Sequence, residues 1–349
     1  MTSAVDPLVK SLQPVIVSLI FLSLLVTGCS RSEVPEILEF TGQTMGTWYS
    51  VKVSELPDSV TPEQVASLIK SQVEGVNSKM STYKPESELS VFNNSPMNTP
   101  FKLSADTFQV LAKSMEIWRQ SMGAFDITIG PLVNVWGFGP RGSAMSIPDQ
   151  ANMAAAWKRV GTDGLSLDRD KSTVQKSKDL YLDLSAIAKG YAVDRVATAL
   201  EQAGIQRYLI ELGGELRAGD PKAPHLPWQV AVEEPETHLR KVHKVIPLNN
   251  VAMATSGDYR NFFEQGGKRY SHTIDPRTGR PVEHRLVSVS VITAQCADAD
   301  AWATAMMVLG PEQGMELAEN KKLAVYMILK SEQGFEVRYS KAFASYLSS

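Results

Sequence analysis

Cysteine is scarce in this sequence: among 349 residues, only Cys29 and Cys296 occur. Two cysteines cannot form a multi-disulfide scaffold or a cysteine-rich zinc or iron–sulfur site, so both classes are excluded. Five histidines are present, and none lies in an HExxH arrangement, which argues against a zinc protease. A charge surplus is also missing, because 35 basic and 38 acidic residues leave a net charge of −3. Electrostatic nucleic-acid binders usually carry a basic surplus, so that class is disfavoured.

Long apolar runs are absent as well, except near the N-terminus. Lys10 precedes an apolar run over residues 15–26. A run of this length is too short to span a bilayer as a helix, which needs about 20 residues. It suits the apolar region of a signal peptide, and an uncleaved N-terminal membrane anchor is the alternative. The segment that follows, Val26-Thr27-Gly28-Cys29, resembles a bacterial lipobox.

The lipobox resemblance implies how the N-terminus is processed. Cleavage before Cys29 would remove the signal peptide, residues 1–28, and leave 349 − 28 = 321 residues with fatty acyl groups on the cysteine. Several acyl chains hold a protein firmly on a bilayer. We therefore expect residues 29–36 to be a lipidated tether and residues 37–349 to be a folded domain on the periplasmic side of a bacterial membrane, with the inner membrane favoured over the outer.

The rest of the chain has the composition of a folded protein, with 43% hydrophobic and 21% charged residues. Alternation over residues 48–53 puts Tyr49, Val51 and Val53 on one side of a half-buried strand. Thr61 followed by Pro62 indicates a helix start with a capping hydroxyl. Taken together, such patterns predict strands at 48–53, 180–184, 208–211, 228–232, 287–291 and 323–329, and helices at 61–79, 104–118, 150–160, 185–203 and 298–309.

Two further patterns concern the organisation of the chain. Residues 81–100 are polar and rich in turn formers, which predicts a surface loop. An apolar stripe at intervals of four predicts one buried face for the helix at 185–203: Leu184, Ala188, Ala192, Val196 and Leu200. No linker, repeat or composition shift divides the chain. The predicted fold class is therefore α+β, a single mixed α/β domain.

Several common catalytic motifs are missing. Residues 137–142 match GxGxxG, but a dinucleotide-binding loop needs a strand before it and a helix after it. Here Trp136 and Pro140 interrupt the pattern and a loop-like stretch follows, so a Rossmann site is disfavoured. No GxxxxGK[ST] or GxSxG segment occurs. The solitary Cys296 is interpreted as a buried structural thiol, with a nucleophile as the alternative.

A first polar motif lies in residues 297–305, within an apolar stretch. If this segment begins a helix, Asp300 and Thr304 are one turn apart on the same face. A carboxylate with hydroxyl or carbonyl oxygens is a ligand set that suits Mg²⁺. The alternative is that Asp298 or Asp300 caps the helix while Thr304 bonds back to a carbonyl.

Two more polar motifs stand near predicted turns. Asp183 precedes a helix start and Lys189 follows within its first turns, where the helix dipole disfavours a cation. A bound phosphate would explain this placement, and so would a solvated lysine. His272 lies just upstream of the turn at Asp275-Pro276. A histidine near a carboxylate can be a general base, or it can be a structural side chain.

Taken together, these motifs resemble the ApbE family of FAD:protein FMN transferases, formerly called thiamine biosynthesis lipoproteins. The resemblance covers essentially the whole mature chain and implies an ApbE-like, T-fold-like domain. Glu215 is a variation, since other members often carry Asp or Asn there. The matching segments are residues 45–47, 80–83, 123–128, 130–132, 183–190, 213–214, 255–257, 272–276 and 299–305.

The resemblance implies a reaction and a set of site residues. The enzyme would bind FAD and Mg²⁺ and move the FMN portion onto a threonine hydroxyl of a target protein, releasing AMP. His272 would take the threonine proton. The metal would be held by the carbonyl of Ala186 with Asp300 and Thr304, and by the carbonyl of Ala303. The FAD site would consist of Met45, Tyr83, Ala124, Phe125, Asp126, Asp183, Lys189 and Ile274.

Three hypotheses about function remain open on the sequence. The leading one is flavin transfer to periplasmic acceptor proteins, such as subunits of Na⁺-pumping NADH:quinone or Rnf-type redox complexes. The second is a metal-dependent FAD pyrophosphatase, which would use water as the nucleophile at the same site and release FMN and AMP. The third is a lipoprotein that binds FAD without catalysis.

Overall fold

The computed structural model describes residues 36–140, 145–235, 241–258 and 261–347. The predicted signal peptide, Cys29 and all of the tether except Glu36 lie outside these ranges. Contacts divide the chain after Glu36, and the compact unit that begins at Ile37 is described below. Within the described ranges, no helix combines the length and apolar character that crossing a membrane requires.

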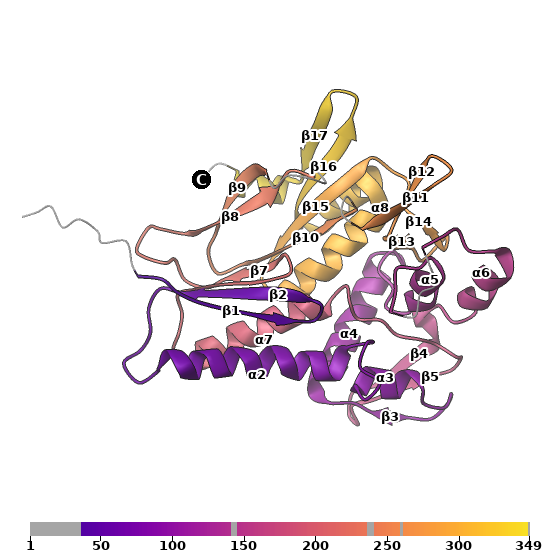
Figure 1. Cartoon of the computed structure of the whole chain (residues 1–349), viewed down its shortest axis with the longest axis horizontal. Coiled ribbons are helices and arrows are strands. Elements are labelled where there is room, and N and C mark those ends of the chain that lie inside the picture. The colour runs from indigo at the N-terminus through magenta and orange to yellow at the C-terminus, as the bar shows by residue number, and fades with distance from the viewer. Residues whose placement is uncertain (1–35, 141–144, 236–240, 259–260, 348–349) are drawn as a thin grey trace, which may run out of the picture. The chain divides into compact units, whose positions relative to one another are not determined.

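An eight-stranded sheet is the centre of the fold (Figure 1). Every neighbouring pair of its strands is antiparallel. The predicted mixed α+β class is therefore confirmed. In spatial order the strands are β1 (Leu38–Thr44), β2 (Thr47–Val53), β6 (Tyr208–Leu212), β7 (Glu215–Ala218), β10 (Ala252–Gly257), β15 (Leu286–Thr293), β16 (Ala324–Ser331) and β17 (Gly334–Tyr339).

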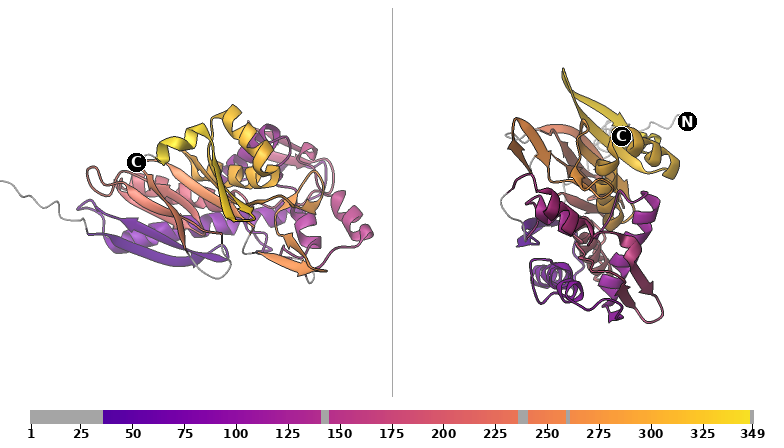
Figure 2. Two further views of the ribbon diagram at one scale, coloured as in Figure 1. Left: turned by 90° about the horizontal axis from the view of Figure 1, so that it is seen from above. Right: turned by 90° about the vertical axis from the view of Figure 1, so that its right-hand side faces the viewer.

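Different layers cover the two faces of this sheet (Figures 1 and 2). Helices α2 (Pro62–Met80), α7 (Ala188–Gln202) and α8 (Cys296–Lys321) pack on one face, with α4 (Ala105–Gln120) against α2 and α8. On the other face lie a two-stranded ribbon, β8 (Trp228–Glu233) with β9 (Val242–Leu248), and a short 3₁₀ segment at Lys341–Tyr346. The sheet is thus the middle layer of three.

Strand β16 shows how one segment serves both layers. Val325, Met327 and Leu329 join the core on the helical side, whereas Tyr326 and Ile328 join the core on the ribbon side. Successive side chains of a strand point to opposite faces, so a strand covered on both faces is apolar throughout. The predicted apolar strand at 323–329 is confirmed by β16. A further strand, β17, follows it and was not predicted.

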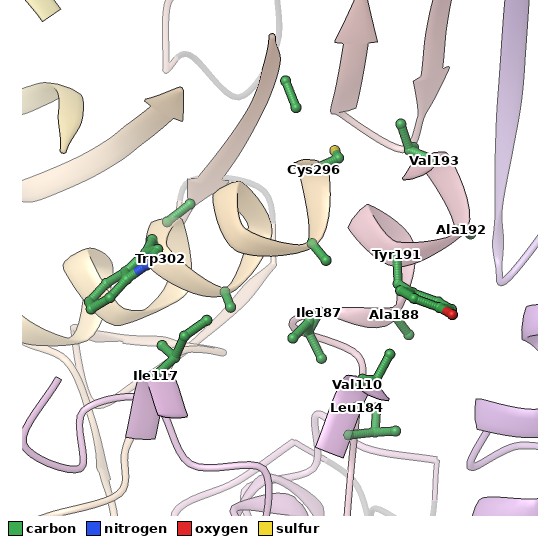
Figure 3. Packing of buried hydrophobic residues seen from close by; sticks show 14 of the residues in the cluster. Val110, Ile117, Leu184, Ile187, Ala188, Tyr191, Ala192, Val193, Cys296 and Trp302 are labelled. Atoms are coloured by element: carbon green, nitrogen blue, oxygen red, sulfur yellow. The ribbon is translucent and has the colours of Figure 1, made fainter. Parts of the chain in front are cut away.

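The helical core joins α4, α7 and α8 (Figure 3). The predicted stripe on α7 is buried along its whole length, from Leu184 to Leu200. Figure 3 shows Leu184, Ala188 and Tyr191 beside Val110 of α4, and Cys296 at the first turn of α8. Burying an aliphatic side chain of this kind contributes about 1.5–3 kcal/mol, so this stripe fixes α7 against its neighbours.

Smaller elements close one end of the molecule. Helices α5 (Gly130–Val135) and α6 (Gln150–Trp157) pack around Trp136 and Ile274. The remaining elements are helix α3 (Glu88–Asn93), a three-stranded sheet of β3 (Phe101–Lys102), β5 (Thr173–Lys176) and β4 (Leu165–Asp168), and two hairpins, β11 (Phe262–Gln265) with β12 (Lys268–Ser271) and β13 (Ile274–Asp275) with β14 (Arg280–Pro281).

Local capping signals explain the helix starts that were predicted well. Thr61 caps α2 in a capping box with Gln64. The hydroxyl of Ser104 accepts from the amide of Thr107 at the start of α4, and Asp149 caps α6 in the same way. The predicted strand at 48–53 is confirmed by β2, in which Tyr49, Val51 and Val53 are buried.

Two expectations about coil and strand are wrong. The segment 81–100 is not only a surface loop, because Ser87 caps helix α3, which buries Leu89 and Phe92. Residues 180–184 form no strand, although all of them except Asp183 are buried. Instead, the side chain of Asn93 pairs with Leu182: its amide donates to the Leu182 carbonyl (2.9 Å) and its oxygen accepts from the Leu182 amide (2.7 Å). A side-chain amide takes the place of a neighbouring strand.

Two further boundaries differ from the predictions. The helix expected at 185–203 begins only at Ala188, after a turn. Helix α8 continues past Leu309 to Lys321, with a break at Gly310, whose φ of 76° precedes Pro311. The predicted strand at 287–291 is part of β15, in which Ser288 and Ser290 are buried like the valines between them. Strand β7 was not predicted from the sequence.

Candidate active site

A cavity of about 450 Å³ lies where the helical layer meets the sheet and the β13 region. Segments from across the chain form its wall, so the cavity exists only in the folded domain. The structure brings together around it the following residues singled out from the sequence: Tyr83, Ala124, Phe125, Asp126, Asp183, Ala186, Lys189, His272, Ile274, Asp300 and Thr304. Their roles remain predictions, but their convergence on one cavity is observed.

Two residues from the predicted set do not line this cavity. Met45 occupies the two-residue turn between β1 and β2, with a φ of 50°, and its side chain packs against the helical core. Positive φ at Met45 and Gly46 matches the turn that joins twisted antiparallel strands. Ala303 is fully buried within α8. The predicted lipidation site, Cys29, lies outside the described residues.

A buried charge cluster forms one side of the cavity. The ammonium of Lys189, on the first turn of α7, lies 2.7 Å from Oε1 of Glu215 and 3.8 Å from Oδ1 of Asp300. The second oxygen of Asp300 accepts a hydrogen bond from the amide of Gly190 (3.0 Å). Lys189 is therefore ion-paired, and the solvated-lysine alternative is wrong.

Burial and neighbouring charges together shift the pKa values of these groups. Burial alone would lower the pKa of Lys189, but Asp300 and Glu215 outweigh it and hold that pKa above its ordinary value. Burial raises the pKa of Asp300, and burial with the nearby Asp300 raises the pKa of Glu215. Two carboxylates share one ammonium here, so the cluster has room for additional positive charge.

The donor set around the cluster fits a hard divalent cation. Oε2 of Glu215 is buried and has no hydrogen-bond partner. Across the cavity wall, the hydroxyl of Thr304 lies 3.4 Å from that of Ser256. Carboxylate and hydroxyl oxygens are the ligands that Mg²⁺ takes, usually completed by water and phosphate. Among the described residues, no three His, Cys, Asp or Glu side chains gather as a metal cluster, so any ion here depends on oxygens of other kinds as well.

Helix α8 is not capped by its own acids. Its N-cap is Gln295, which makes no side-chain cap. Instead, Asp194 of α7 accepts from the amides of Cys296 and Ala297, both at 2.9 Å. Asp298 pairs with Lys113 (2.6 Å). The alternative that Asp298 or Asp300 caps this helix is therefore wrong, and Asp300 is left to face the cavity.

His272 lines the cavity, and a hydrogen bond shows which of its ring nitrogens carries the proton. Its Nδ1 lies 2.9 Å from the carbonyl oxygen of Asn261. A carbonyl can only accept, so Nδ1 carries the proton and Nε2 keeps a free lone pair. Burial lowers the pKa of His272, and the charge of Lys189 adds to that effect. The imidazole is therefore neutral near pH 7, as a general base must be.

Apolar and aromatic side chains form another part of the cavity wall. Phe125 is buried, whereas Tyr83 is 71% exposed. The ring of Phe138 meets His272 edge to face, with centroids 6.2 Å apart. Phe138 belongs to the segment that formally matched GxGxxG, and no strand precedes that segment, which follows α5. The interpretation against a Rossmann loop agrees with this arrangement, although Gly139 and Pro140 also line the cavity.

Two carboxylates brace the loops that carry the apolar side. Asp126 accepts from the amide of Thr128 (2.7 Å) and from the hydroxyl of Thr162 (2.8 Å). Asp183 accepts from the amide of Ser185 (2.8 Å), and its own amide donates to the carbonyl of Ile127 (2.7 Å). These bonds tie the segment around Phe125 to the turn that leads into α7.

Sequence reasoning gave no role to several cavity residues. Glu215 stood out only as a variation after paired glycines, yet its carboxylate is central to the charge cluster. Thr255 and Ser256 belong to a quoted motif, and only the folded sheet places them beside Thr304. Cys296 is fully buried, and burial raises the pKa of its thiol, which confirms the structural interpretation.

The fold matches that of solved flavin transferases. The structure of the flavin transferase ApbE from Vibrio cholerae superimposes with a TM-score of 0.83 at 40% sequence identity, over 89% of this chain and 99% of that one. Pseudomonas stutzeri flavinyl transferase ApbE, in its apo form, gives the same TM-score at 38% identity, over 90% of this chain and 98% of that one.

Sequence comparison gives the family itself. Residues 45–327 match the model of the ApbE family. The FAD:protein FMN transferase of Haemophilus influenzae is 44% identical over 314 residues, which cover 88% of this chain and 90% of the relative. The Escherichia coli K12 protein of the same name is 39% identical over 342 residues, covering 95% and 97%. This chain belongs to the ApbE family, and the resemblance identified from its motifs is confirmed.

Proposed function

We propose that this protein transfers the FMN portion of FAD to a threonine hydroxyl of a target protein and releases AMP. One observation carries the proposal beyond family membership. A neutral His272 with a free Nε2 and a charge cluster of Lys189, Asp300 and Glu215 line the same cavity. Phosphoryl transfer to a hydroxyl needs both a base and stabilisation of charge on phosphate oxygens.

The proposed metal is Mg²⁺. The side chains of Asp300 and Thr304 would hold it with the carbonyl oxygens of Ala186 and Ala303, and the unpaired oxygen of Glu215 supports a cation nearby. When bound, the ion would supply positive charge to the phosphate oxygens. Met45 does not line the cavity, so it can contact FAD only if the β1–β2 turn moves toward the cavity.

The reaction balances with the residues present. The threonine Oγ of the acceptor attacks the phosphorus attached to the riboflavin side of FAD. A new P–O bond forms, the P–O bond to the bridging oxygen breaks, and AMP leaves with that oxygen. Nε2 of His272 takes the hydroxyl proton. Lys189 stands where a cation offsets charge on the pyrophosphate, and Phe125 and Tyr83 offer surface for an aromatic ring.

A mass spectrum of an acceptor peptide tests the proposal directly. A peptide with a Ser/Thr-Gly-Ala-Thr segment is incubated with the enzyme, FAD and Mg²⁺. Gain of an FMN mass on the threonine, with equal release of AMP, is the expected result. Rapid release of free FMN and AMP without any acceptor would instead establish the pyrophosphatase. FAD that survives intact with metal and acceptor would establish a binding protein without catalysis.

The predicted signal peptide and lipidated cysteine are part of the same proposal. Residues 1–28 act as a lipoprotein signal peptide, and acylated Cys29 holds the enzyme at the periplasmic side of the inner membrane. Its targets there would be subunits of Na⁺-pumping NADH:quinone or Rnf-type complexes. Labelled palmitate should be incorporated into the wild-type protein and not into Cys29→Ser, which should leave the membrane fraction. Equal membrane retention of both proteins would contradict the lipid anchor.

A further inference from the structure

A second hollow, of about 530 Å³, lies on the face of the sheet opposite the catalytic cavity. Strand β2 shows the two faces. Tyr49, Val51 and Val53 point into the helical core, so Trp48 and Lys52 point to the other side, where they line the second hollow. We call this hollow the outer groove, and its other walls come from β1, β6, β8 and β10.

The two hollows share lining residues at a gap in the strand pairing of the sheet. Gly213, Thr255 and Gly257 line both of them. Strand β10 pairs with β15 along its whole length, but it pairs with β7 only at Ala252 and Met253. Beyond that point, β6 and β7 turn back on each other at Gly213-Gly214. In the described part of the chain, no strand pairs with the β7-facing edge of β10 from Thr255 to Gly257.

We propose that the outer groove binds an extended segment of the acceptor protein and that the acceptor threonine reaches the catalytic cavity through this gap. The inference rests on the proposed flavin transfer. A free strand edge pairs readily with an added extended chain. The side of the sheet that faces the helices is left for FAD, so the two substrates approach from opposite faces.

Charge in the outer groove distinguishes its occupant from FAD. Its charged side chains are Glu39, Glu211, Glu233 and Lys52. Lys52 lies 3.9 Å from Glu39, so this cation is already shared. Glu211 is exposed and forms no ion pair with another described residue. An acidic groove repels the pyrophosphate of FAD and favours a polypeptide with a basic residue near its threonine.

The shape of the outer groove suits a polypeptide as well. Trp48, at its rim, is 59% exposed and is a large aromatic surface of the kind that dominates protein interfaces. Trp48 is also tied to the gap, because its carbonyl accepts from the amide of Gly213 (3.2 Å). A Cβ placed on Gly214 would meet no atom within 4 Å, so there is free space beside this residue at the β6–β7 turn.

The experiment compares groove variants with matched controls elsewhere on the surface. Trp48→Ala and Glu211→Lys alter the groove. Tyr339→Ala likewise removes an exposed aromatic ring, on β17, and Glu332→Lys makes the same charge change in the β16–β17 turn. Two synthetic acceptor peptides are used, with either lysine or glutamate beside the Ser-Gly-Ala-Thr segment. The KM values for peptide and for FAD are measured separately, with melting temperature as the check on folding.

Trp48→Ala should raise the KM for peptide at least about tenfold and leave the KM for FAD unchanged. Glu211→Lys should raise the KM for the lysine peptide and lower the KM for the glutamate peptide, while both controls behave as wild type. If both groove variants keep the wild-type peptide KM, the groove is not the acceptor site, and flavin transfer itself still stands. If the KM for FAD rises instead, FAD occupies the groove and the proposal is wrong.

Direct binding keeps the groove proposal separate from the proposed function. Fluorescence anisotropy of the labelled lysine peptide needs no chemistry, so it reports on the groove even if no FMN is transferred. Loss of binding in Trp48→Ala, with binding retained in Tyr339→Ala, supports the groove. Equal binding in both variants overturns it. Absence of transfer by wild-type enzyme with FAD and Mg²⁺ refutes the flavin transferase proposal alone.

Discussion

Gly190 should be the most sensitive point of contact between α7 and α8. A Cβ added there would lie 2.7 Å from the carbonyl carbon of Cys296 and 2.9 Å from Cα of Ala297. Carbon atoms in contact are normally about 3.5–4.0 Å apart, so one helix must move by about 1 Å. Both obstacles are backbone atoms, which cannot rotate away. The amide of Gly190 also donates to Asp300, so the movement disturbs the charge cluster directly.

Two opposing effects set the size of the change in Gly190→Ala. Alanine gains about 0.5–1 kcal/mol over glycine inside a helix, whereas overpacking costs about 1–3 kcal/mol. The free energy of unfolding, measured by urea denaturation, should therefore fall by about 0–2.5 kcal/mol. A misplacement of about 1 Å can reduce turnover about 100-fold, so FMN transfer should suffer far more than stability.

Gly75 of α2 provides the matched control. A Cβ at Gly75 would meet no atom within 4 Å, so Gly75→Ala should stabilise the protein by about 0.5–1 kcal/mol and leave transfer unchanged. The same glycine-to-alanine substitution should thus lower the stability at Gly190 and raise it at Gly75. If Gly190→Ala is as stable and active as Gly75→Ala, the close spacing of α7 and α8 does not hold the site together.

Three further outcomes are expected. Asp300→Asn should abolish Mg²⁺-dependent turnover, and normal activity across a Mg²⁺ titration would show that the metal lies elsewhere. His272→Ala should keep FAD affinity, measured by flavin fluorescence, and slow transfer by about 10²–10⁴-fold. The pKa of His272 is lowered from 6.5, so the rate of wild-type transfer should persist below pH 6.5 and fall only where Nε2 becomes protonated. The His272→Ala variant should lack this loss of rate at acid pH. Asn93→Leu leaves both backbone groups of Leu182 unpaired and should cost about 2–5 kcal/mol in thermal or urea unfolding, and a smaller loss would mean that water replaces the amide.

Elements with local signals could be predicted from the sequence. Thr61 and Ser104 cap their helices through neighbouring amides, and the side chains that alternate along β2 need only one partner layer. Such features depend on residues within one turn or one strand. For this reason the starts of α2 and α4 agree with the predictions, and the mixed α+β class follows from the order of strong helices and strands.

Elements shaped by distant contacts could not be predicted. Residues 180–184 look like a strand, but Asn93 supplies their hydrogen bonds from a helix far back in the chain. Ser288 and Ser290 alternate with valines along β15, yet these serines are buried as well. Polar residues in a strand indicate solvent only when the second layer is absent, and the sequence does not reveal that layer.

The candidate site shows the same division. Spacing alone placed Asp300 and Thr304 on one face of a helix, which α8 confirms. The approach of Lys189 to Asp300, and of Glu215 to both, joins a helix start, a second helix and a strand. No sequence periodicity predicts these contacts between separate elements. The family resemblance, and not residue spacing, placed Lys189 and Asp300 in one site. The unpaired oxygen of Glu215 emerged only from the folded structure.

The cap that α7 provides for α8 has a consequence for the order of folding. Helix α8 has no cap of its own, and a cap contributes about 0.5–2 kcal/mol. Asp194 supplies it only after α7 has docked, with Arg217 of β7 holding the carboxylate at 2.7 Å. We therefore expect the first turns of α8, which carry Asp300, to become stable only after α7 and β7 have assembled. Flavin binding should appear in refolding only with the last kinetic phase, because its site cannot form ahead of the fold.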